Sequence, residues 1–151
     1  GRTPAMNVFV DAKIYPNGYD FPNPILEQKN MSDKIRQDAN KRRLGFTIFP
    51  GDKIQVNNTM TVSRNDIKRA SDWMKKVHDI DFKYVSLTII GCISYRFVLG
   101  NEHHQTGFIL DLSQNVPERP GVHLAINPEK GDVPMSLLKL TPNVLSSGIT
   151  D

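Results

Sequence analysis

The residues with the clearest potential for chemistry are Glu102, His103 and His104, which are consecutive in the sequence. Imidazole and carboxylate groups bind transition metals and move protons, so this cluster could serve a metal-dependent or hydrolytic enzyme. Neighbouring side chains on a strand point to opposite faces, which makes it hard for His103 and His104 to share one metal. The other histidines are His78 and His123, and the sequence contains no paired metal-binding motif. We therefore expect a structural hydrogen bond from one of the two adjacent histidines, with His104 as the candidate.

The rest of the sequence lacks the signatures of common enzyme classes. Cys92 is the only cysteine, which excludes an internal disulfide framework and a cysteine-rich zinc site. It has apolar neighbours in a strand pattern, which is typical of a small buried side chain. The sequence has no nucleophile elbow, phosphate-binding glycine loop or dinucleotide fingerprint. We therefore expect neither catalytic residues nor a cofactor.

Basic residues gather in two segments that have helical patterns, and acidic residues interrupt both. The chain has 19 Lys and Arg against 16 Asp and Glu, and its net charge of +3 is too small for a dedicated nucleic-acid binder. The absence of an aromatic ladder also argues against single-stranded nucleic acid. A solvated helix face explains the two segments, with an anionic partner as the alternative. The group considered for an anionic membrane surface comprises Lys34, Arg36, Lys41, Arg42 and Arg43.

Size and composition predict a single folded unit. The chain has 151 residues, of which 38% are hydrophobic, and a mean hydropathy of -0.39. This length is enough to bury a core without disulfides or metals. No stretch reaches the roughly 18 apolar residues of a membrane-spanning helix, and the first residues lack the features of a secretory signal.

Alternation of apolar and polar residues predicts antiparallel strands. The predicted strands cover residues 7–14, 46–49, 53–62, 83–98 and 106–112, and the last two form a β-hairpin. Because helices are few and strand–helix units do not alternate, the pattern favours a mainly β fold. We predict an antiparallel β-sandwich with one or two short inserted helices.

The segments between these strands predict a loop and two helices. Prolines and an Asn-Gly pair predict a loop over residues 15–30, and a marginal surface helix is expected over residues 33–43. A capping pattern at Ser63 and Asp66 predicts a second helix that ends near His78. Its apolar stripe predicts that Trp73 is a core residue.

The sandwich is expected to span residues 1–114, with a proline-rich tail over residues 115–151 packed on it. The strand over residues 7–14 would have an unpaired edge, which natural proteins rarely leave bare. We expect the tail around residues 122–126 to cover this edge. The alternative is a second molecule, so the chain is either a monomer or a dimer formed by edge-strand pairing.

Two stretches together resemble an uncharacterised soluble domain of bacterial membrane-anchored proteins. The first is Gly-Arg-Thr-Pro-Ala-Met-Asn-Val at residues 1–8, similar to that domain's Asn-x-Gly-x-Thr-Pro-Ala-x-Asn-Val opening. The second is Gly-Cys-Ile-Ser-Tyr at residues 91–95, followed by Gly100 and by His-Gln-Thr-Gly-Phe at residues 104–108. It is similar to the domain's closing hairpin. The polar insertion at residues 25–44 and the tail after residue 114 depart from the family's pattern.

The resemblance implies an immunoglobulin-like sandwich displayed at a membrane. It also implies that a strand and a membrane anchor precede residue 1, which would make this chain a fragment, and it leaves the side of the membrane open. With the empty catalytic search, it predicts a non-enzymatic interaction or accessory module whose partner is a protein. The alternative is the metal-dependent or hydrolytic enzyme that uses Glu102, His103 and His104.

Overall fold

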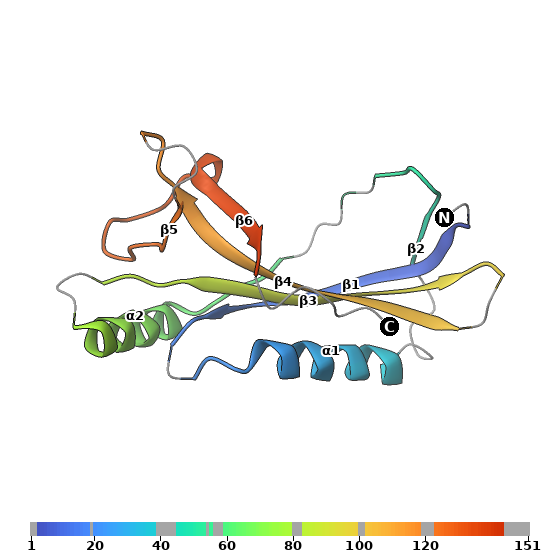
Figure 1. The fold of residues 1–151 in the computed structure, drawn as a ribbon, viewed down its shortest axis with the longest axis horizontal. Coiled ribbons are helices and arrows are strands. Elements are labelled where there is room, and N and C mark those ends of the chain that lie inside the picture. Colours follow the sequence, from blue (N-terminus) through green and yellow to red (C-terminus); the bar gives the residue numbers. More distant parts are fainter. Residues whose placement is uncertain are drawn as a thin grey trace.

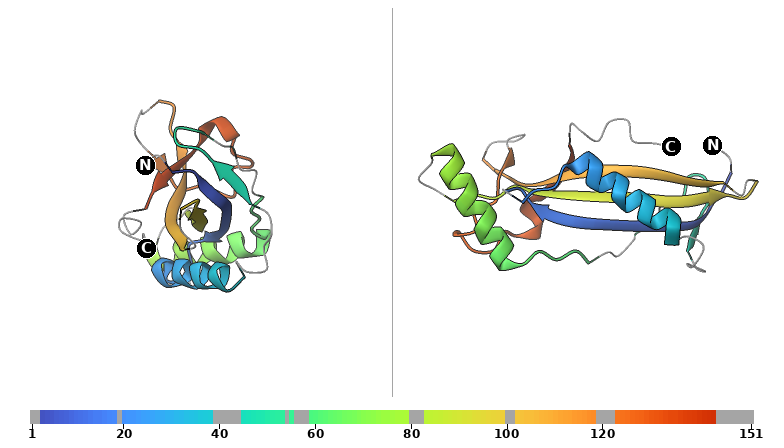
Figure 2. Two further views of the ribbon diagram at one scale, coloured as in Figure 1. Left: turned by 90° about the vertical axis from the view of Figure 1, so that its right-hand side faces the viewer. Right: turned by 90° about the horizontal axis from the view of Figure 1, so that it is seen from below.

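The structure, a computed structural model, describes residues 3–18, 20–38, 45–53, 55, 59–79, 83–99, 102–118 and 123–143. In this part of the chain, a curled antiparallel sheet carries two α-helices (Figures 1 and 2). The elements are β1 (Ala5–Pro16), α1 (Pro24–Asp38), β2 (Phe46–Ile48), α2 (Arg64–His78), β3 (Leu87–Phe97), β4 (His103–Asn115), β5 (His123–Leu124), the 3-10 helix η1 (Met135–Leu137) and β6 (Leu138–Pro142).

The strands join in one sheet with the order β2-β1-β3-β4-β5, and β6 also pairs with β4. All of the pairings are antiparallel, and the three long strands β1, β3 and β4 form its centre. The structure therefore confirms a mainly β, antiparallel fold with two helices. A second sheet packed face to face, which a sandwich requires, is not found among the described residues. The finer sandwich prediction is not confirmed.

The carboxyl-terminal segment lies at the opposite edge of the sheet from the one predicted. β5 and β6 pair with β4, and Ile126 forms an isolated bridge with Val85. The edge of β1 is instead partly covered by β2, through the pairs Ala5 with Ile48 and Val8 with Phe46. The prediction that the tail covers the edge of β1 is therefore wrong. The physical reason is that β3 pairs with only one edge of β4, so the other edge of β4 is available to β5 and β6.

The helix α1 begins earlier and is more buried than predicted. The side chain of Asn23 accepts hydrogen bonds from the amides of Ile25 and Leu26, both at 3.1 Å. Pro24 takes the first helical position, where a missing N–H is not needed. The prediction of a loop through residue 30 is therefore wrong, because its Pro-Asn-Pro sequence is a helix start. The last residues of the predicted helix, 39–43, lie outside the described part of the chain.

The helix α1 packs along one face of the sheet (Figure 2). Its buried residues are Gln28, Met31 and Ile35. Met31 forms a core cluster with Ile90 of β3 and Ile109 of β4, both of which are fully buried. The expectation that this helix lies on the surface is therefore wrong, because its narrow apolar stripe meets the centre of the sheet.

The helix α2 agrees with the capping prediction. The amide of Asp66 donates to the Ser63 hydroxyl oxygen at 3.1 Å, which fixes the start of the helix. Ala70 packs with Val85 and Leu87 in a second core cluster. Trp73 is only half-buried, so the prediction that it is a core residue is not confirmed.

The strand predicted over residues 53–62 is not found in its described residues. Residues 53, 55 and 59–62 have no strand structure, and residues 54 and 56–58 lie outside the described part.

Candidate functional site

The predicted cluster at Glu102, His103 and His104 lies where β4 begins, at the end of the long β3–β4 hairpin (Figure 1). The register pairs Tyr95 with His104 and Arg96 with His103. The two histidines are therefore on opposite faces of the sheet, as their adjacency in a strand predicts. Glu102 is exposed. Within the described ranges, no group of three or more His, Cys, Asp or Glu side chains could hold a metal ion.

His103 makes the structural hydrogen bond of this pair. The Nε of Arg96 donates to its Nε2 at 2.7 Å, and its Nδ1 is buried and has no hydrogen-bond partner among the residues that the structure describes. Burial lowers the pKa of His103, and the positive charges of Arg96 and Arg36 lower it further. His103 therefore acts as a neutral acceptor that orients Arg96.

This arrangement predicts a pH-dependent contribution of His103 to stability. Because its pKa in the folded state lies below the ordinary value of about 6.5, protonation favours the unfolded chain. The stabilisation is present above that ordinary pKa and is lost as the pH falls through the lowered one. We expect wild type to lose more free energy of unfolding than His103→Gln between about pH 8 and pH 5. Urea denaturation measures this, His78→Gln is the control, and identical profiles for wild type and His103→Gln would contradict it.

His104 has a different role, in an aromatic cluster on the other face. Its ring stacks on Tyr95 at a centroid distance of 5.7 Å and lies 5.0 Å from the ring of Phe97. The structural hydrogen bond thus belongs to His103 and not to His104. The reason is that Arg96 lies directly across the hairpin from His103.

Exposed apolar side chains gather at the same end of the sheet. Ala5 pairs with Ile48 on one side and with Phe97 on the other, which brings β2 and the hairpin end together. We define the hairpin-end surface as the exposed residues Met6, Phe46, Phe49, Phe97, Val98 and Leu99. Leu99 is the most open of them, with 89% of its surface exposed. Large exposed apolar patches mark interaction sites on soluble proteins.

The carboxyl-terminal end of α1 brings basic residues close to this surface. The Nη2 of Arg36 donates to Gln105 Oε1 at 3.3 Å, which ties the end of the helix to the beginning of β4. Lys34 is exposed on the same part of the helix. Of the basic group considered for a membrane surface, Lys34 and Arg36 are thus placed near the hairpin end. The other members, at positions 41–43, lie outside the described residues.

Sequence reasoning missed the hairpin-end surface. Residues 99–105 separate the two predicted strands of the hairpin, and Phe97, Val98 and Leu99 are three consecutive apolar residues directly before this turn. A turn after a strand is normally polar, so three consecutive apolar residues at this position are the sequence signal that indicates an exposed apolar surface. The contribution of β2 depends on its pairing with Ala5, which no local pattern reveals.

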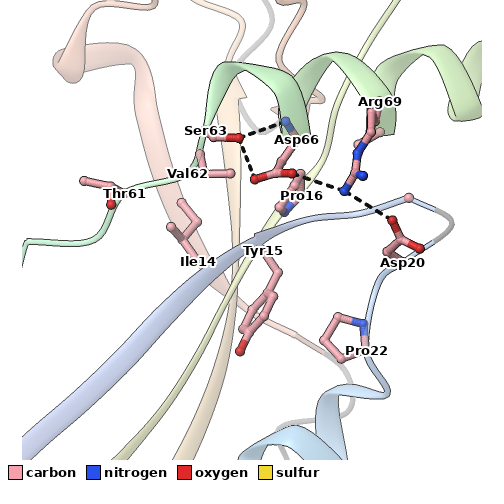
Figure 3. A pocket seen from close by; sticks show the side chains of 12 residues that line it. Ile14, Tyr15, Pro16, Asp20, Pro22, Thr61, Val62, Ser63, Asp66 and Arg69 are labelled. Atoms are coloured by element: carbon pink, nitrogen blue, oxygen red, sulfur yellow. Dashed lines mark hydrogen bonds and ion pairs between the residues drawn. The ribbon is translucent and has the colours of Figure 1, made fainter.

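A hollow of about 330 Å³ lies between β1 and the start of α2 (Figure 3). Its charged groups contact one another: Arg69 Nη2 lies 3.2 Å from Asp66 Oδ1 and 3.3 Å from Asp20 Oδ2. The Ser63 hydroxyl donates to Asp66 Oδ2 at 2.6 Å. These contacts cap α2 and join it to the segment that follows β1, so the hollow's polar groups have structural roles.

Tyr15 joins β1 to α1 beside this hollow. Its hydroxyl donates to Glu27 Oε1 at 2.5 Å, and Lys13 Nζ lies 3.7 Å from the same oxygen. Burial raises the pKa of Tyr15, and the hydrogen bond to Glu27 raises it further. The phenol therefore stays protonated and acts as a fixed donor. Sequence reasoning missed this link because it assigned Glu27 to a loop.

No known protein family, curated protein or solved structure matches this chain. In the described part of the chain, neither helix is long and apolar enough to cross a bilayer.

Proposed function

We propose that this chain is a non-enzymatic interaction module that works at a membrane, and that its hairpin-end surface contacts an anionic bilayer. The observation that carries the proposal is the exposed run Phe97, Val98 and Leu99 at the end of a long hairpin. A narrow tip of this kind can enter the headgroup region without burying the rest of the sheet. Aromatic side chains such as Phe46 and Phe49 on the same surface favour the interface between lipid and water.

The basic residues at the end of α1 suit an anionic lipid surface, although the exposed carboxylates of Asp33 and Glu102 at the same end oppose part of their charge. Lys34 and Arg36 lie near the hairpin end, and each basic residue close to an anionic membrane contributes about 1 kcal/mol. Burial of the apolar tip adds to this at roughly 25 cal/mol per Å². The two contributions come from adjacent surfaces, so one orientation of the molecule satisfies both.

The resemblance to membrane-anchored proteins supports the same orientation. The anchor that it predicts would join the fold before β1, and Ala5 at the start of β1 pairs with Phe97. A membrane attached there would face the hairpin end. The immunoglobulin-like fold and bacterial origin stay predictions of the resemblance. A protein partner, the other expectation from the sequence, would use the same exposed surface.

Vesicle sedimentation tests the proposal. We expect the chain to bind vesicles of phosphatidylcholine with phosphatidylserine, and the double variant Val98→Ser/Leu99→Ser to bind at least about tenfold more weakly. Lys34→Gln should weaken binding only at low salt, because screening removes its contribution. Met135→Ser is the matched control, since Met135 is 87% exposed on η1, away from the hairpin.

Two results would overturn the membrane proposal. One is the absence of binding to anionic vesicles at low salt. The other is binding that Val98→Ser/Leu99→Ser and Met135→Ser reduce equally, because the hairpin would then have no special role. A protein captured by wild type but not by Val98→Ser/Leu99→Ser, with no vesicle binding, would assign the surface to a protein partner instead.

A further inference from the structure

We propose that the cavity between α2 and the carboxyl-terminal strands binds an aliphatic carboxylate of the fatty-acid type. This cavity has a volume of about 690 Å³. The helix α2, which lines it, lies at the opposite end of the sheet from the tip of the β3–β4 hairpin (Figure 1). Small-molecule sites typically have volumes of about 300–1,000 Å³. The site is separate from the proposed membrane contact and goes beyond it.

The inner wall of the cavity is apolar and firmly held. Val85 and Leu87 lie in its wall and are almost fully buried, and Leu112 and Ile126 complete the wall. Two backbone hydrogen bonds between Val85 and Ile126, at 2.8 and 2.9 Å, fix the carboxyl-terminal segment on the sheet. A hydrocarbon chain in contact with these side chains would leave water, and each methylene buried would add to the affinity.

The rim of the cavity on the side of α2 is basic. Arg64 and Lys68 line it from successive turns of one helix face. Within the described residues, neither side chain has an ion-pair partner. Both are exposed, so a ligand's head group can reach them from solvent.

The other charged groups at the rim carry more negative than positive charge. Lys83 Nζ lies 3.0 Å from Asp72 and 3.5 Å from Glu129, so this group of three carries one positive and two negative charges. Asp132 adds a further negative charge to the lining, so these groups together balance the two charges of Arg64 and Lys68. The preference for an anion is therefore local, because Arg64 and Lys68 lie together on α2 and, within the described residues, are the lining cations without an ion-pair partner. An aliphatic carboxylate matches this cavity, because its hydrocarbon chain would contact the apolar wall and its single negative charge would lie beside Arg64 and Lys68.

Calorimetric titration with dodecanoate, below the concentration at which it forms micelles, tests the site. We expect saturable binding of one molecule per chain. Arg64→Gln/Lys68→Gln should bind dodecanoate about tenfold more weakly, because a charged contact is lost. The same variant should bind dodecanol, the uncharged match, as wild type does. Lys75→Gln/Lys76→Gln removes equal charge from α2 without touching the cavity, and should bind dodecanoate like wild type.

A filling variant locates the hydrocarbon chain. Ile67 lines the cavity from α2, and Ile67→Trp should abolish binding of both dodecanoate and dodecanol. Should this variant fail to fold, the charge variants still decide the question. Val98→Ser/Leu99→Ser should leave dodecanoate binding unchanged, which separates this site from the proposed membrane contact.

Three results would overturn the proposal. The first is the absence of saturable dodecanoate binding. The second is equal weakening by the Arg64/Lys68 and Lys75/Lys76 double variants, which would indicate attraction to the helix as a whole. The third is loss of binding in Val98→Ser/Leu99→Ser, which would place the ligand at the hairpin end.

Discussion

Replacing Ile109 with alanine should lower the free energy of unfolding by about 3–5 kcal/mol, because the change removes fully buried methylene groups and leaves a cavity. Ile109 has no exposed surface and packs with Met31 of α1 and Ile90 of β3. It therefore joins the helix to the sheet through a cluster that lies in the centre of the fold. Urea denaturation measures the effect through the shift of the midpoint.

The matched control is Ile25→Ala on the exposed side of α1. Ile25 is 47% exposed, so the same deletion there should cost less than about 1 kcal/mol. Similar losses for the two variants would show that α1 does not pack on the sheet as described. If Ile109→Ala lowers the free energy of unfolding by the expected amount, and the slope of that free energy against urea concentration is unchanged, the substitution has changed only the packing of the native state.

Local patterns predicted the elements whose signals lie within a few residues of one another. Ser63 and Asp66 are three residues apart and reciprocally define the start of α2. The alternation in β3 and β4 is long enough to predict their hairpin from sequence alone. In both cases the residues that make the contact are also the residues that make the pattern.

The helix α1 shows why the rest of the fold could not be predicted in this way. Its sheet-facing side includes polar residues, and their partners are distant in sequence: Ser32 donates to Cys92 Sγ at 3.2 Å, and Gln105 donates to the Ser32 carbonyl at 2.8 Å. A hydrophobic-periodicity argument counts such residues as exposed. Ser32 is half-buried where the sheet offers it hydrogen bonds, and Gln28 is fully buried although neither polar atom of its amide has a partner within the described residues. The burial of Cys92 itself was predicted and is confirmed.

The histidines of the hairpin also combine a feature that the local sequence predicts with one that depends on a distant partner. Their opposite orientations follow from strand geometry, which the sequence reveals. Which of them is hydrogen-bonded depends on the register that pairs Arg96 with His103. That register is set by the turn and the whole length of the hairpin. The sequence thus identified His103 and His104 as candidate residues, but it did not predict which side chains they contact.

Replacing Gly107 with alanine is expected to destabilise the fold by about 3 kcal/mol, because overpacking against the fully buried Gln28 displaces side chains or backbone. The added methyl group would overlap the side-chain amide of Gln28 on α1. Gln28 has no exposed surface, so its amide cannot turn into solvent to make room. Glycine at this position therefore permits the close approach of α1 to β4.

The double variant Gly107→Ala/Gln28→Ala tests this explanation. Gln28→Ala removes the amide that the methyl group would strike, and both polar atoms of that amide lack hydrogen-bond partners within the described residues. We therefore expect the double variant to be more stable than Gly107→Ala, with a coupling energy of about 1–3 kcal/mol in a double-mutant cycle. Additive losses measured by urea denaturation would show instead that Gly107 is needed for its backbone in β4 and not for the approach of the helix.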